Sequence, residues 1–300
     1  MRSMPWQVLI VLYIVLSYVI HPVLKKRISA APSRTRNLVW QYFFAAILAG
    51  STAVICKTHL WDRRLLIVMV IGAFNAFACY CSWRAVAISM SKTAIATQWD
   101  DMITLGLGYL VLNEGKLLNP ILLVGVVISV GSALFFTLVR KAPSTEMSSP
   151  TATPERSRLG LWIILYSVIW GGAVFSMRYF ALEGISLLSY VAAWYAGSFL
   201  GALVVFAVAG KKEAGENLTR KQVVGIIPLA ASCWLPLMTE YWISSLAPTT
   251  VYQPIYQVAE MVLPTIIGLW LFKEAKDLRP IDKAVFAVGM AGGLIIVLSY

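Results

Sequence analysis

Long apolar stretches with almost no charge recur along the whole 300-residue chain, and they constrain its fold more than any other feature. A helix needs roughly 18 to 20 apolar residues to cross a hydrocarbon layer about 30 Å thick, and these stretches are long enough. Membrane strands alternate apolar and polar residues, whereas these stretches are continuous. The sequence therefore predicts an all-α integral membrane protein with ten transmembrane helices, at residues 6–24, 38–56, 65–83, 94–112, 120–139, 160–180, 187–209, 223–246, 249–272 and 281–299.

Composition agrees with a membrane protein and argues against a nucleic-acid partner. Apolar residues make up 59% of the chain and charged residues only 13%, about half of the ~25% that is usual in soluble domains. The net charge of +11 comes from Lys and Arg that lie almost entirely between the apolar stretches. Basic residues in such places set membrane orientation and contact lipid headgroups. No basic stripe of a soluble fold is present, so we expect membrane lipids as partners and no nucleic acid.

An internal repeat at an offset of 160 residues is the second organising feature. Residues 93–120 and 253–280 each contain an apolar span with an acid inside it, a short charged loop and a proline that opens the next span. A fixed spacing over a span, a loop and the following span is typical of an internal duplication. The pairs related by this offset are Asp100 and Glu260, Glu114 and Glu274, Lys116 and Lys276, and Pro120 and Pro280.

A polar stretch rich in Ser, Thr and Pro separates the two copies at residues 140–158, and we interpret it as a flexible linker. The sequence thus predicts a first five-helix repeat at 1–139, a polar linker at 140–159 and a second five-helix repeat at 160–300. Because five is an odd number, the second repeat enters the membrane in the opposite sense. Five-plus-five inverted repeats of this kind build transporters whose substrate site lies near the bilayer midplane.

Four carboxylates lie well inside the predicted spans, and they are the strongest functional signal. An ionised carboxylate at the bilayer centre is disfavoured by about 2.5–3.5 kcal/mol on insertion scales, so each needs a cavity, a partner or a proton. One interpretation is structural, with each acid held by an Arg or by hydrogen bonds between helices. We favour the other, a transport pathway, because ionisable residues inside membranes commonly mark one. The four are Asp100, Asp101, Glu240 and Glu260.

Helical spacing groups further polar and aromatic side chains with these acids. Tyr252, Tyr256 and Glu260 are four residues apart and share one helix face, with Gln257 beside them. We therefore predict a substrate-binding site formed by Asp100, Asp101, Glu240, Tyr252, Tyr256, Gln257 and Glu260.

No pattern in the chain predicts catalysis. There are only two histidines, no metalloprotease His pair and no Gly-rich phosphate loop, and the four cysteines complete no metal site. We expect no enzymatic activity, no cofactor and no metal. The alternative is a polytopic membrane enzyme that acts on a lipid-linked substrate. Asp100 and Asp101 are similar to the paired aspartates of membrane prenyltransferases, but Thr104 stands where the third aspartate of that pattern belongs.

Three stretches carry a resemblance to the drug/metabolite transporter superfamily, in particular its EamA-like group. They are LGYLVLNEGKLLNPILLVGVVISVGSALFF (105–136), GLWLFKEAKDLRPIDKAVFAVGMAGGLIIV (268–297) and Trp170–Gly171. The resemblance covers nearly the whole chain and implies a carrier that works by alternating access. Asp101 replaces the proline usual midway along the fourth span of that family, so the carboxylate pair inherits no role from it.

Together these patterns predict a secondary transporter that moves a small polar metabolite as one five-span half rocks against the other. Acids exceed bases inside the spans, which indicates a cationic substrate such as an amine, held by carboxylates and aromatic faces. Alternatively protons titrate these acids, because burial favours the neutral form of a carboxyl group. We expect a multi-pass integral protein of a prokaryotic plasma (inner) membrane, with a small-molecule substrate and protons as its other partners.

Overall fold

The computed structural model describes residues 6–29, 33–114, 120–139, 158–210, 217–273 and 280–298, and all regular structure within these ranges is helical. Six helical stretches among them are long and apolar enough to cross a membrane, which confirms the prediction of an all-α chain of membrane type. They are Trp6–Ser29, Arg34–Ile55, Arg64–Ile88, Leu159–Leu182, Leu187–Ala209 and Arg220–Leu246.

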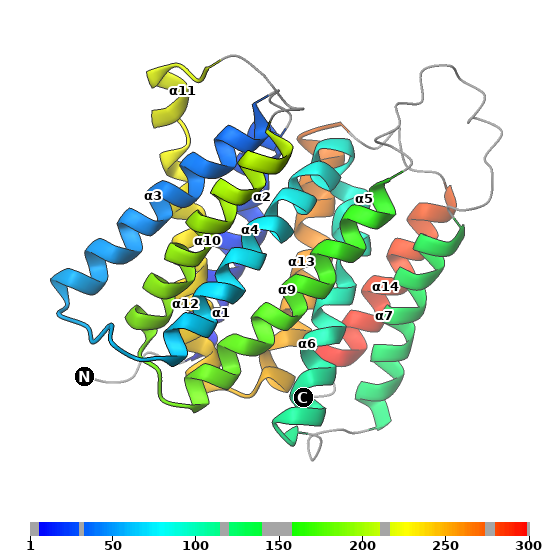
Figure 1. The fold of residues 1–300 in the computed structure, drawn as a ribbon. Helices are drawn as coiled ribbons and strands as arrows, with labels where there is room; N and C mark the ends of the chain where they lie inside the picture. Colours follow the sequence, from blue (N-terminus) through cyan, green and yellow to red (C-terminus); the bar gives the residue numbers. More distant parts are fainter. Residues whose placement is uncertain are drawn as a thin grey trace. The chain divides into compact units, whose positions relative to one another are not determined.

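The chain forms two compact units, and each draws on both halves of the sequence (Figure 1). Unit 1 comprises Met1–Trp83 and Ala173–Ala247, and unit 2 comprises Arg84–Gly172 and Pro248–Tyr300. Two of the three boundaries fall within helices, namely α4 (Arg64–Ile88) and α9 (Leu159–Leu182), and the third follows Ala247. The predicted polar linker lies outside the described residues except for its last two positions, as do Lys116, Glu274 and Lys276 of the repeat.

Unit 1 is a bundle in which α3 packs against both α10 and α12, and α1 also lies against α12. Helix α10 approaches α4 closely because glycines line the contact. A Cβ atom built on Gly197 would lie 1.9 Å from the carbonyl oxygen of Met69, and one on Gly201 would lie 2.3 Å from that of Ala73. The further helices of this unit are α1 (Trp6–Ile14), η1 (Val15–Ile20), α2 (His21–Ser29), α3 (Arg34–Ile55), α10 (Leu187–Ala209), α11 (Arg220–Val224) and α12 (Ile227–Leu246).

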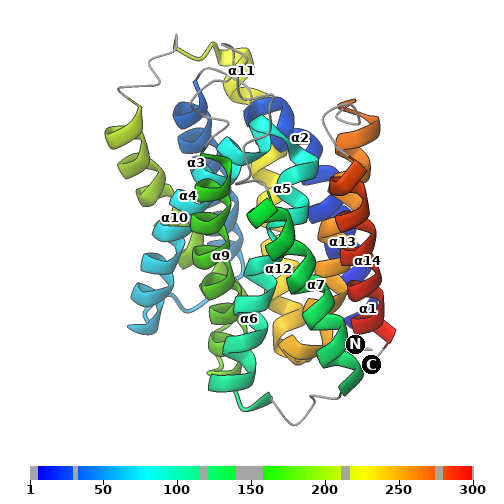
Figure 2. The same cartoon turned by 90° about the vertical axis from the view of Figure 1, so that its right-hand side faces the viewer.

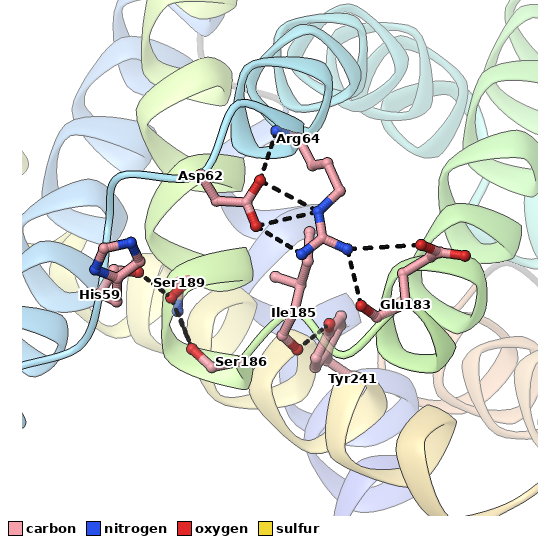
Figure 3. A network of polar contacts seen from close by, with 8 residues as sticks. All are labelled: His59, Asp62, Arg64, Glu183, Ile185, Ser186, Ser189 and Tyr241. Carbon is pink, nitrogen blue, oxygen red and sulfur yellow. Dashed lines mark hydrogen bonds and ion pairs between the residues drawn. The ribbon is translucent and has the colours of Figure 1, made fainter.

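A polar network ties together two loops at one end of unit 1 (Figure 3). The carboxylate of Asp62 accepts hydrogen bonds from the backbone N–H of Arg64 at 2.9 Å and from its Nη2 at 2.7 Å. The same guanidinium donates through Nη1 to the carbonyl oxygen of Glu183 at 2.8 Å. Nearby, the Tyr241 hydroxyl donates to the carbonyl of Ile185 at 2.7 Å. The loop before α4 is thereby fastened to the loop before α10.

In unit 2, α7 and α14 run side by side, and α13 packs against α5, α6 and α14 (Figure 2). The helices are α5 (Met90–Ala96), α6 (Gln98–Val111), α7 (Pro120–Val139), α13 (Thr249–Trp270) and α14 (Pro280–Leu298).

The predicted span 94–112 differs from the structure, which divides it into α5 and α6 at Thr97. The Thr97 hydroxyl donates to the carbonyl oxygen of Ala94 at 3.2 Å. Thr side chains compete in this way with the backbone for hydrogen bonds, which disturbs a regular helix. The break places the next residues, including Asp100, in the first turn of a new helix.

Candidate functional site

Three carboxylates from two helices of unit 2 form a cluster, which we call the acid cluster. Asp100 and Asp101 come from α6 and Glu260 from α13, and one oxygen of each lies within 4.8 Å of the others. Both aspartates are only 2% exposed, and Glu260 is half-buried. The structure thus brings Asp100 together with Glu260, the acid to which the sequence repeat relates it.

Helix α6 holds the two aspartates in its first turn, where the positive end of the helix dipole favours negative charge. The backbone N–H of Asp101 donates to Oδ1 of Asp100 at 3.0 Å. The other oxygen, Oδ2 of Asp100, is buried and has no hydrogen-bond partner among the described residues. A buried carboxylate oxygen without a partner is costly, and a proton, a cation or a hydrogen-bond donor would remove that cost.

Helix α9 packs directly on the backbone beside Asp100. The hydroxyl of Thr104 donates to the carbonyl oxygen of Asp100 at 2.9 Å and to that of Gly171 at 3.0 Å. A Cβ atom at Gly171 would lie 2.6 Å from the Asp100 carbonyl oxygen and 2.8 Å from Cβ of Ile103. Glycine at this position therefore permits the close approach of α9 to α6.

Two polar side chains link the acid cluster across helices. The hydroxyl of Thr97 donates to Oε1 of Glu260 at 3.1 Å, and the amide of Gln253 donates to Oδ1 of Asp101. Neither Thr97 nor Gln253 is among the predicted site residues. The signal was present in the spacing, because Gln253 lies seven residues before Glu260 and so on the same face of α13.

The predicted aromatic residues lie on the face of α13 that carries Glu260. Tyr252 and Tyr256 are fully buried on consecutive turns, and their ring centroids are 5.2 Å apart. Gln257 is also fully buried in this helix. Helix α13 is therefore lined on one side by phenol rings, amides and a carboxylate.

Glu240 is the one predicted site residue that belongs to the other unit of the chain. It belongs to α12 in unit 1 and is 2% exposed. The six other predicted site residues all belong to unit 2.

The oxygen atoms of the acid cluster and of the side chains around it are suited to bind positively charged ligands. Carboxylate, amide and hydroxyl oxygens bind hard cations and ammonium groups. Three ionised carboxylates at this separation in a medium of low dielectric constant repel one another strongly, so neutralisation by a proton or a cation is favoured. Within the described part of the chain, Asp100, Asp101 and Glu260 form the group of side chains that could hold a metal ion.

Comparisons with known proteins bear on the fold. No family model matches the chain, and no curated protein matches it. One solved structure, described as "Crystal structure of protein", is similar with a TM-score of 0.63 at 15% sequence identity. The likeness covers 98% of this chain and 96% of that one, so a solved protein shares the fold over nearly the whole length.

Proposed function

We propose that the protein is a secondary transporter that moves a small polar metabolite across a membrane by alternating access. The observation that carries the proposal is the buried acid cluster in a chain with six membrane-length apolar helices. Placing such charge inside a bundle is disfavoured, and ionisable residues in membranes commonly serve substrate or ion pathways. The acid cluster binds a cationic group of the substrate, such as an amine, or the coupling proton.

The architecture that we propose is ten transmembrane helices in a five-plus-five inverted repeat of the EamA-like type. Two pairs of helices related by the sequence offset pack against each other within unit 2, which supports the proposal. These pairs are α6 with α13 and α7 with α14. Contacts between equivalent elements are what an internal two-fold relation produces.

The proposed amine substrate rests on the surroundings of the acid cluster. Asp100 and Glu260 provide negative charge, and the rings of Tyr252 and Tyr256 lie on the same helix as Glu260. Carboxylates pair with ammonium groups, and aromatic faces attract cations through their quadrupole. A cationic amine combines both requirements in one ligand.

Uptake of labelled amines into proteoliposomes, with and without a pH gradient, tests the function. We expect saturable uptake that exceeds the uptake by protein-free liposomes and that a pH gradient accelerates if protons are coupled. Uptake equal to that of protein-free liposomes for every amine, with either gradient, would contradict an amine transporter.

The Asp100–Asp101 pair, together with Glu260, supports one alternative, a polytopic membrane enzyme acting on a lipid-linked substrate. Carboxylate clusters of this kind can hold the divalent ions that bind phosphorylated groups. Turnover of a lipid-linked substrate in detergent, where no gradient exists, would favour this enzyme over a transporter.

A further inference from the structure

A pocket of about 460 Å³ lies in unit 1, and its lining comes from the end of α2, the start of α3 and the region of α11. Figures 1 and 2 show α11 at the same end of the bundle as the start of α3. The pocket belongs to neither the acid cluster nor its helices, and the inference drawn from it does not depend on the proposed function. Its polar lining residues are Arg27, Ser33, Asn37, Asn217, Thr219 and Gln222.

Several polar groups face this pocket without a partner in the protein. Within the described part of the chain, the side chains of Arg27, Ser33 and Asn37 make no hydrogen bond or ion pair. Asn37 is only 4% exposed and Ser33 only 6%, so both residues are largely buried in the wall of the pocket. Buried polar side chains are normally satisfied, and a ligand in the pocket would satisfy these.

The pocket also lies at the N-terminus of α3, which is 22 residues long. Ser33 occupies the N-cap position, yet its side chain makes no capping hydrogen bond. The first N–H groups of any α-helix have no partner within the helix, and the helix dipole makes this end positive. Such helix ends bind anions, phosphate in particular.

The described charged residues of the segments that line this pocket are basic. The described acids of unit 1 are Asp62, Glu183 and Glu240, and none of them lines the pocket. Arg36 fixes one wall, because its Nη1 donates to Oδ1 of Asn217 at 2.8 Å. The basic residues of the three segments are Lys25, Lys26 and Arg27 on α2, Arg34 and Arg36 on α3, and Arg220 and Lys221 on α11.

The segment around α11 completes the lining with Thr219 and Gln222. The side-chain oxygen of Gln222 accepts from the backbone N–H of Thr219 at 2.8 Å and from its hydroxyl at 3.0 Å. The amide nitrogen of Gln222 remains as a donor. The pocket therefore offers a guanidinium, the NH2 groups of three amides, a hydroxyl and a helix N-terminus, which together match the oxygens of a phosphate group.

We propose that this pocket binds a phosphate-bearing anion, with the Arg27 guanidinium and the first turn of α3 as its principal contacts. Two membrane-length helical stretches, Trp6–Ser29 and Arg34–Ile55, meet here, so the pocket lies at the end of predicted spans, where lipid headgroups are found. The phosphate belongs either to an anionic lipid headgroup or to a soluble molecule. Basic pockets between transmembrane helices bind anionic headgroups in this way.

The test measures the apparent melting temperature of the purified full-length protein in detergent during three titrations. The probes are phosphatidylglycerol in mixed micelles, phosphatidylcholine as the zwitterionic lipid, and inorganic phosphate. A ligand that binds only the folded state raises this temperature in a saturable way. We expect saturation by phosphatidylglycerol or by inorganic phosphate, with little effect of phosphatidylcholine. Phosphatidylglycerol alone identifies a lipid headgroup, and a response to inorganic phosphate identifies a soluble ligand.

Variants connect the response to the pocket. Arg27→Gln removes an exposed charge and should leave the fold intact while it weakens the apparent affinity about tenfold, the range expected for loss of a charge-assisted hydrogen bond. Asn37→Asp keeps the size of the side chain but repels an anion, and should weaken binding at least as much. Arg63→Gln is the matched control, an exposed arginine directly before α4 that does not line the pocket. No saturable response to either phosphate probe, or the same affinity in Arg27→Gln as in the wild type, would overturn the proposal.

Discussion

At the scale of single residues, the acid cluster depends on a few short-range hydrogen bonds. Thr97 and Gln253 each donate to one carboxylate, and the backbone of Asp101 donates to Asp100. These neutral donors orient the acids without neutralising them, because no positive charge accompanies such donors.

Asp62 gives a prediction for the pH dependence of stability. Hydrogen bonds from the Arg64 side chain, more than any other cause, lower the pKa of Asp62 from its ordinary value of 3.8. A carboxyl group whose pKa is lowered on folding stabilises the folded state above its ordinary pKa. That contribution disappears as the pH falls through the lowered pKa.

We therefore expect Asp62→Asn to reduce the apparent melting temperature slightly at pH 7 and to reduce it less at pH 2, where more of Asp62 is protonated. The reduction is small because the pair is exposed, and exposed ion pairs contribute little. Melting curves of wild type and variant at both pH values measure this, with Glu183→Gln reporting on the other acid near Arg64. A destabilisation of the same size at both pH values would contradict the role assigned to the pair.

At the scale of helices, the contact of α9 with α6 gives a prediction about stability. A methyl group at Gly171 would collide with the backbone of Asp100. Backbone atoms within a helix cannot move aside as easily as the end of a flexible side chain. Gly171→Ala should therefore lower the stability by about 1–3 kcal/mol, as overpacking commonly does, and should break the Thr104 hydrogen bond to residue 171.

Gly172→Ala is the matched control, because a Cβ atom at Gly172 would meet nothing within 4 Å. Alanine in the helix interior is favoured over glycine by about 0.8–1 kcal/mol, so this variant should be as stable as the wild type or more stable. Apparent melting temperatures of the two variants in the same detergent check the pair. Equal destabilisation by both substitutions would show that helix α9 does not rest on α6 in this way.

Most helices could be predicted from the sequence because continuous apolar stretches fix their positions, and the described helices occupy most of each predicted range. The division at Thr97 could not, since the apolar pattern continues across it without a change. The proximity of Asp100 and Glu260 could be anticipated from the sequence, because the internal repeat places the two acids at equivalent positions. The roles of Thr97 and Gln253 could not be predicted, because sequence spacing does not show which carboxylate each side chain contacts.

At the scale of the whole molecule, the chain forms two units that each combine segments from both halves of the sequence. The acid cluster lies entirely within unit 2, where α6 and α13 contribute the two repeat-related acids. The pocket proposed to bind phosphate, at the ends of α2 and α3, lies entirely within unit 1. Our account thus assigns a ligand of opposite charge to each unit, a cation to unit 2 and an anion to unit 1.

Uptake of a labelled amine by variants of the acid cluster tests the central claim most directly. Asp100→Asn and Glu260→Gln keep the shape of each side chain and remove its charge, and Glu183→Gln, an exposed acid of unit 1, is the control. Our account predicts that each of the first two lowers initial uptake about tenfold or more and alters its pH dependence, since a charge-assisted contact is lost, while the control transports like the wild type. Unchanged uptake with an unchanged pH profile in both cluster variants would contradict it.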